Sequence, residues 1–177
     1  TVARLVLFPR RLAADFADHA RGSGYFTTVA GTCVLGSQCL LVADWRGAAE
    51  TLFAAGLALW VVVMYAFFAA VIVRETKPTL EQGINGAWLI ATVATQSVAV
   101  LALALGDPFG WPEEAVAFGA LVFFLVGCML YLAIIPLIFY RLTFIRLDSH
   151  DFGPPYWINM GAVAISTLAG SILLQRT

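Results

Sequence analysis

Charged residues are scarce in this sequence, and they are missing altogether from five long stretches. Asp, Glu, Lys and Arg make up 12% of the 177 residues, about half of the ~25% that is usual for soluble domains. A helix of a soluble domain needs a polar face toward water, and uncharged stretches of this length do not provide one. The formal net charge of −1 also excludes a broad basic surface, so we expect no nucleic-acid partner.

Reactive groups are missing from the same stretches. None of them contains Asp, Glu or His, which proton-coupled carriers commonly place within the membrane. The cysteines show no CxxC or Cys/His spacing and the histidines have no companion at ligand spacing, so we expect no metal site and no cofactor. No motif of a serine hydrolase, zinc protease or nucleotide-binding loop occurs, and we expect no catalytic residue.

The five uncharged stretches predict membrane-spanning helices. Each has at least 22 residues, and a helix of that length reaches roughly 33 Å, enough to cross a hydrocarbon core of ~30 Å. Strict alternation of apolar and polar residues, as in barrel strands, does not occur. The sequence therefore predicts an all-α, polytopic transmembrane helix bundle that forms a single domain over residues 1–177. The predicted spans are 22–43, 51–73, 82–106, 115–140 and 152–175.

The first residues predict that another helix precedes this chain, and the positions of the basic residues predict its orientation in the membrane. Residues 1–12 are mostly apolar up to Pro9, apart from Thr1 and Arg4, and then basic. This is typical of the end of a preceding helix, so we expect a fragment of a longer protein. Eight of the ten Lys and Arg residues lie on one side of the spans. The positive-inside rule places that side in the cytoplasm of a multi-pass protein of the cell membrane. The bases expected at the cytoplasmic mouth are Arg21, Arg74, Lys77, Arg141 and Arg146.

Two kinds of span alternate along the chain. The first, third and fifth are rich in small, hydroxyl and amide residues, whereas the second and fourth carry large aliphatic and aromatic residues. Large apolar side chains suit lipid, while hydroxyl and amide groups prefer a polar or protein-lined environment. The pattern predicts that the odd spans surround a pathway and that the even spans pack outside them. The residues expected to line this pathway are Thr28, Thr32, Gly36, Asn85, Thr92, Gln96, Asn159, Ser166 and Gly170.

The same residues allow an alternative interpretation. Small residues at four-residue spacing are typical of close helix packing, and a buried Ser or Thr often bonds to its own backbone. On this alternative the chain is a non-transporting membrane subunit whose small-residue faces serve packing and assembly. Gln96 favours the pathway more strongly, because a buried amide needs partners for both its donor and its acceptor. An uncharged pathway suits an anion or a neutral solute, with nearby bases gathering anions at its mouth.

Three parts of the sequence carry a resemblance to a known family. They are Gly24–Thr32 with Val34–Gln38, Gly83–Leu89 running into Val93–Val100, and Pro154–Ala162. In them the chain resembles the tellurite-resistance/C4-dicarboxylate transporter family, which belongs with the voltage-dependent or slow anion channels. The resemblance covers essentially the whole chain.

The resemblance implies a fold and a function. Members have ten transmembrane helices in five hairpins around an uncharged central pore, with the odd helices inside, and they commonly form homotrimers. On that template the five spans are helices three to seven. The phenylalanine that gates the pore in relatives would follow Thr177, so no gate residue is carried over. We therefore expect part of a non-enzymatic channel or carrier, embedded in the lipid bilayer, for small anions or C4-dicarboxylates.

Overall fold

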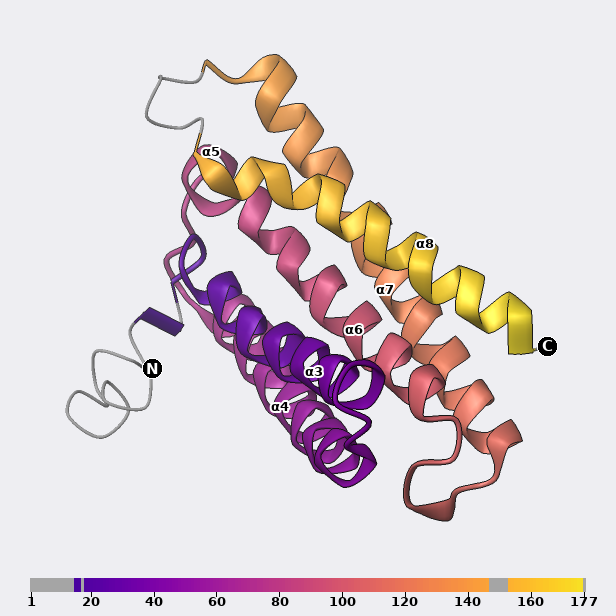
Figure 1. Ribbon diagram of the computed structural model, residues 1–177. Helices are drawn as coiled ribbons and strands as arrows, with labels where there is room; N and C mark the ends of the chain where they lie inside the picture. The colour runs from indigo at the N-terminus through magenta and orange to yellow at the C-terminus, as the bar shows by residue number, and fades with distance from the viewer. Residues whose placement is uncertain (1–14, 17, 147–152, 177) are drawn as a thin grey trace.

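The computed structural model describes residues 15–16, 18–146 and 153–176, which form helices joined by short turns (Figure 1). The long helices are α3 (Phe26–Leu41), α4 (Arg46–Val73), α6 (Ile90–Leu105), α7 (Glu113–Phe144) and α8 (Ile158–Arg176). The short helical elements are η1 (Gly22–Tyr25), α5 (Leu80–Gly83), η2 (Gly86–Leu89), η3 (Pro108–Gly110) and η4 (Pro154–Trp157). The predicted all-α, polytopic bundle is confirmed. The helix end predicted at residues 1–12 lies outside the described residues.

Most of the long helices have the length and composition of membrane-spanning helices. Within the described part of the chain, four segments are long and apolar enough to cross a membrane, namely Arg46–Val73, Gly86–Leu105, Glu113–Phe144 and Pro154–Arg176. The fifth long helix of the described residues, α3, has 16 residues and follows η1 directly. Its Gly, Thr, Ser and Gln residues make it less apolar. Both α4 and α7 extend beyond the uncharged stretches, because a helix can carry charged residues where it leaves the hydrocarbon core. The chain is a multi-pass membrane protein.

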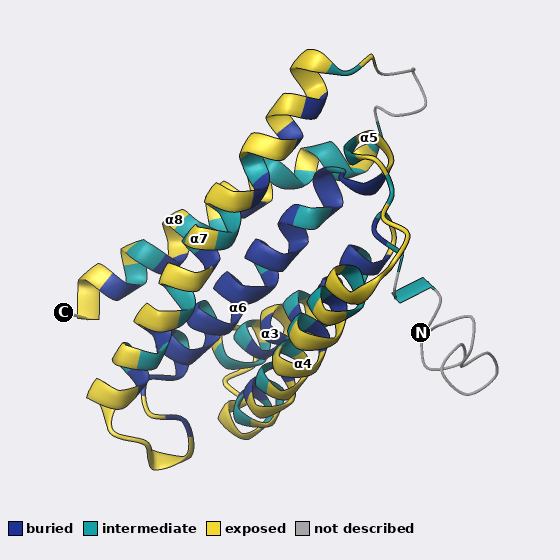
Figure 2. Cartoon of the chain, turned by 180° about the vertical axis from the view of Figure 1, so that it is seen from behind, coloured by how far each residue is buried: buried dark blue, intermediate teal, exposed yellow. Residues whose placement is uncertain are grey.

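Helix α6 lies at the centre of the bundle. It contacts α3 and α4 on one side and α7 and α8 on the other, and Figure 2 shows it as the most deeply buried helix. Its residues are buried except Val93, Val100 and Ala104, which are half-buried. The third span is therefore surrounded by protein along nearly its whole length.

Small residues allow the other helices to approach α6 closely. A Cβ atom added at Gly36 of α3 would lie 2.7 Å from a methyl carbon of Leu101. At Gly127 of α7 it would lie 2.5 Å from Nε2 of Gln96. Within a bilayer, helices gain little from apolar burial alone, so close van der Waals packing at such positions is what holds them together.

The two bulky helices have an inner and an outer face. On α4, Phe67 is fully buried, and the indole Nε1 of Trp60 donates a hydrogen bond to Oγ1 of Thr95 at 2.9 Å. Other large apolar side chains of α4 and α7 are exposed, which suits contact with lipid tails. The exposed set includes Val61, Val62, Tyr65, Ile72, Phe118, Val122, Leu125, Met129, Leu132 and Phe139.

One end of the bundle is held by polar contacts between short elements. The indole Nε1 of Trp88 donates to the carbonyl oxygens of His19 and Gly83, at 2.8 and 3.0 Å. Oδ1 of Asn85 accepts the backbone N–H of Ala87 and so caps η2. The guanidinium of Arg141, near the end of α7, donates to the hydroxyl of Tyr156 in η4. These bonds join the segment before α3 to the segment before α6, and the segment before α8 to α7.

At the opposite end, charged pairs connect separate helix pairs. Nη2 of Arg46 lies 2.5 Å from Oδ1 of Asp107, and Nε of the same arginine donates to Oε1 of Glu50 at 3.0 Å. The start of α4 is thus linked to the turn after α6. Arg176 and Glu113 similarly link α8 to α7, with 3.1 Å between Nη1 and Oε1.

Gly86 allows η2 and η4 to touch, so its replacement tests this contact. An added Cβ would lie 2.6 Å from the carbonyl carbon of Pro155 and closer still to its oxygen. Because backbone must move to make room, we expect Gly86→Ala to destabilise the fold by about 1–3 kcal/mol. Gly119→Ala is the matched control, since nothing lies within 4 Å of its added Cβ. Thermal unfolding of the full-length protein in detergent checks this, and equal loss in both variants would contradict the contact.

His19 predicts a pH dependence of stability. Its burial lowers the imidazole pKa from 6.5, Arg74 and Lys77 lower it further, and Asp18 opposes them. The folded protein therefore binds this proton less readily than the unfolded chain does. Stability should be unaffected by this group above pH ~6.5 and should fall as the pH drops below that value. Melting temperatures measured between pH 7.5 and 5 should decline less steeply in His19→Gln; parallel curves for both proteins would contradict this account.

Candidate functional site

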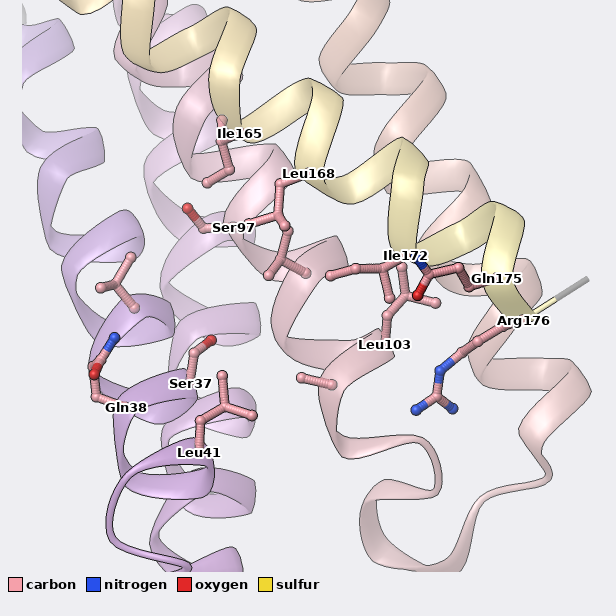
Figure 3. A pocket seen from close by; sticks show the side chains of 13 residues that line it. Ser37, Gln38, Leu41, Ser97, Leu103, Ile165, Leu168, Ile172, Gln175 and Arg176 are labelled. Carbon is pink, nitrogen blue, oxygen red and sulfur yellow. The ribbon is translucent and has the colours of Figure 1, made fainter.

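A groove runs along one face of the bundle between α3 and α8, with α6 as its floor (Figure 3). Its volume is about 610 Å³. The residues that line this central groove are Val34, Ser37, Gln38, Leu41, Ser97, Val100, Leu103, Ala104, Ile165, Leu168, Ile172, Gln175 and Arg176. All of them belong to the first, third and fifth predicted spans except Arg176, which directly follows the fifth. None of these lining residues comes from α4 or α7, which pack behind the other helices.

The floor of the central groove is one stripe of α6. Val93, Ser97, Val100 and Ala104 follow one another at steps of four, three and four residues and therefore share a face of the helix. Val93, Val100 and Ala104 are the only residues of α6 that are not buried, and Ser97, Val100 and Ala104 line the groove. The sole open face of the central helix is thus the face toward the groove.

The lining of the central groove is apolar with a few polar groups. The hydroxyl of Ser37 donates to the carbonyl of Cys33 at 3.1 Å, and that of Ser97 donates to the carbonyl of Val93 at 2.7 Å. Each hydroxyl thus donates its hydrogen bond to a backbone carbonyl of its own helix, and it can rotate to donate to a passing solute instead. The lining residues include no carboxylate and a single cation, Arg176. These groups suit an anion or a neutral polar solute better than a cation.

The predicted lining residues of α6 are placed between helices. Gln96 is fully buried against α7, and its Nε2 donates to the carbonyl of Phe124 at 3.2 Å. Thr92 is also fully buried. Among the described residues, neither Oγ1 of Thr92 nor Oε1 of Gln96 has a hydrogen-bond partner.

The predicted residues of α3 and α8 are placed in a similar way. The hydroxyls of Thr28 and Thr32 donate to the carbonyls of Tyr25 and Thr28, both at 2.7 Å. Gly36 packs against Leu101 and Leu52. Ser166 and Gly170 line a separate, more open groove beside Phe124 of α7, rather than the central one.

The two predicted asparagines have structural partners. Asn85 caps η2, and Oδ1 of Asn159 accepts a hydrogen bond from the hydroxyl of Tyr131 at 3.0 Å. None of the nine predicted residues therefore lines the central groove, and a pore-lining role for them stays a prediction. Two residues that do line it, Ser37 and Ser97, directly follow the predicted Gly36 and Gln96. One residue corresponds to a turn of ~100° about a helix, so on α3 and α6 the groove lies on the face next to the predicted one.

The five predicted bases of the cytoplasmic mouth belong to the same end of the bundle. Arg21 precedes η1, Arg74 follows α4, and Lys77 lies in the turn after it; all three are exposed. Arg146 is exposed just beyond α7. Arg141 is buried and contacts Tyr156, so in this structure it links two elements.

Comparison with known proteins gives a family match over nearly the whole chain. Residues 1–176 match the family described as voltage-dependent anion channel. Two uncharacterized membrane proteins of Mycobacterium tuberculosis, from strains CDC 1551 and H37Rv, are each 44% identical to this chain over 46 residues. That segment covers 26% of this chain and 23% of each relative. No solved structure matches the chain.

Cysteine substitutions at two valines of α6 test which face of this helix is in contact with water. Val100 lines the central groove, whereas Val98 is fully buried. In a full-length protein without other reactive cysteines, Val100→Cys should react with a water-soluble thiol reagent at least tenfold faster than Val98→Cys. The rates can be followed by gel shift in membranes. Equal rates would contradict an open, hydrated groove at this stripe.

Proposed function

The chain belongs to the voltage-dependent anion channel family, and on that premise we propose that it forms one wall of a membrane pore for small anions. The central groove supports this proposal most directly. Its lining comes from α3, α6 and α8, carries no carboxylate, and includes hydroxyl, amide and guanidinium groups. A pathway of this kind stabilises an anion through hydrogen-bond donors and does not offer a titratable acid for proton coupling.

The groove is open along one side, so the proposal needs further helices to enclose it. The resemblance to ten-helix relatives supplies them: α3, α6 and α8 would be three of five inner helices, and α4 and α7 two of the outer ones. The exposed apolar faces of α4 and α7 fit an outer position next to lipid. C4-dicarboxylates are the finer substrate that the resemblance suggests, alongside inorganic anions. A homotrimer in the cell membrane is the expected assembly.

The alternative function, a non-transporting membrane subunit, also has a specific observation in its favour. Gly36, Gln96 and Gly127 all serve contacts between helices, as packing alone would require. We favour the pore because packing does not account for the one open stripe of the otherwise buried α6. A subunit built only for assembly has no need of a groove that combines polar groups with that stripe.

Narrowing the groove distinguishes the two functions. In liposomes that contain the full-length protein, we expect uptake of chloride or succinate that protein-free liposomes lack. Val100→Phe adds bulk at the floor of the groove and should lower uptake about tenfold. Val122→Phe makes the same change on the exposed side of α7 and should alter uptake by less than about twofold. A wild-type protein that passes neither anion would remove the case for a pore, and equal effects of both variants would contradict this groove as the pathway.

A further inference from the structure

Arg176 occupies a distinctive position at one end of the central groove. It is the last described residue of α8, and it is the single positively charged residue among those that line the groove. By the orientation predicted above, this end faces the outside of the cell. A cation at the end of an apolar groove raises the local concentration of anions, because the low-dielectric walls screen its field less than water does.

The side chain of Arg176 is held in place from two directions. Its Nη1 lies 3.1 Å from Oε1 of Glu113 on α7. It also passes close over Gly106, the residue directly after α6, where an added Cβ would lie 2.9 Å from Nη1. Gly106 has a positive φ of 78°, a conformation that favours glycine. The glycine therefore leaves room for the guanidinium, and the negative end of the α6 dipole stabilises its charge.

The second arginine at this end has a different environment. Arg46 pairs with both Glu50 and Asp107 and also donates to the carbonyl of Asp107 at 3.1 Å, and it is not among the residues that line the central groove. Arg176 pairs with one carboxylate, and its side chain is 32% exposed. A guanidinium has five N–H donors, and the hydrogen bond to Glu113 uses one of them.

Building on the proposed pore, we propose that Arg176 recognises anions at the outer end of the central groove. Glu113 holds the guanidinium in position and competes with the incoming anion for it. The ligands that fit are small inorganic anions and carboxylates, since a guanidinium binds two oxygens of a carboxylate side by side. Arg176 thus determines how well the groove collects anions from outside, while the floor of the groove sets its width.

Paired variants of the full-length protein in liposomes test this role. With chloride supplied at low concentration and low ionic strength on the outer face, Arg176→Gln should lower initial uptake about tenfold, and this difference should shrink as inert salt is raised toward ~1 M. Arg46→Gln removes the same charge from the same end outside the groove and should change uptake by less than about twofold. Glu113→Gln should increase the apparent affinity for chloride several-fold, and Glu50→Gln, its control, should not.

The outcomes separate this inference from the pore itself. If the wild type passes anions and Arg176→Gln matches it at every ionic strength, the inference is wrong and the pore stands. If Arg46→Gln and Arg176→Gln have equal effects, a general surface charge is acting, and the inference is likewise wrong. If the wild type passes no anion, both proposals fail. Arg176→Lys keeps the charge and should retain most of the uptake, and if Arg176→Gln does not fold, the responses of Arg176→Lys and Glu113→Gln decide the question.

Discussion

The burial of α6 among four other helices is the constraint on which the rest of the structure depends. A bilayer offers no water to drive apolar side chains together, so a helix is surrounded by others only where their backbones can come close. Glycines on α3 and α7 face Leu101 and Gln96 of α6 and provide that proximity. The one stripe that α6 leaves open then lies between α3 and α8, where the central groove forms. The same packing of helices around α6 therefore both buries this helix and leaves the central groove.

The charged residues act where the helices end. At one end of the bundle, the ion pair of Arg46 with Asp107 connects the start of α4 to the turn after α6, and that of Arg176 with Glu113 connects α8 to α7. At the other end, hydrogen bonds of Trp88 and of Arg141 perform the same task. Uncharged spans avoid the cost of burying charge in the hydrocarbon core, and the charged residues at their ends link neighbouring helices.

The sequence predicted much of the fold and less of the site, for a physical reason. Uncharged stretches of spanning length follow directly from the energetics of the bilayer, and they identified the helices and the fold class. The presence of hydroxyl or glycine residues on a helix does not by itself show whether they face a pathway or a neighbouring helix. Ser97 lines the groove while Ser166 lies beside α7, yet both hydroxyls donate to a carbonyl of their own helix. Gln96 required a buried partner, and Phe124 provides it on the side away from the groove. Only the packing of neighbouring helices distinguishes such positions.

The most direct test of the account is an experimental structure of the full-length protein in a lipid nanodisc, at a resolution that shows ordered water and acyl chains. We expect α3, α6 and α8 to border an enclosed, water-containing channel, with Ser37 and Ser97 on its wall and lipid confined to α4 and α7. Acyl chains lying along Val100 and Ala104, or another helix packed into the groove without any continuous water, would contradict the central claim.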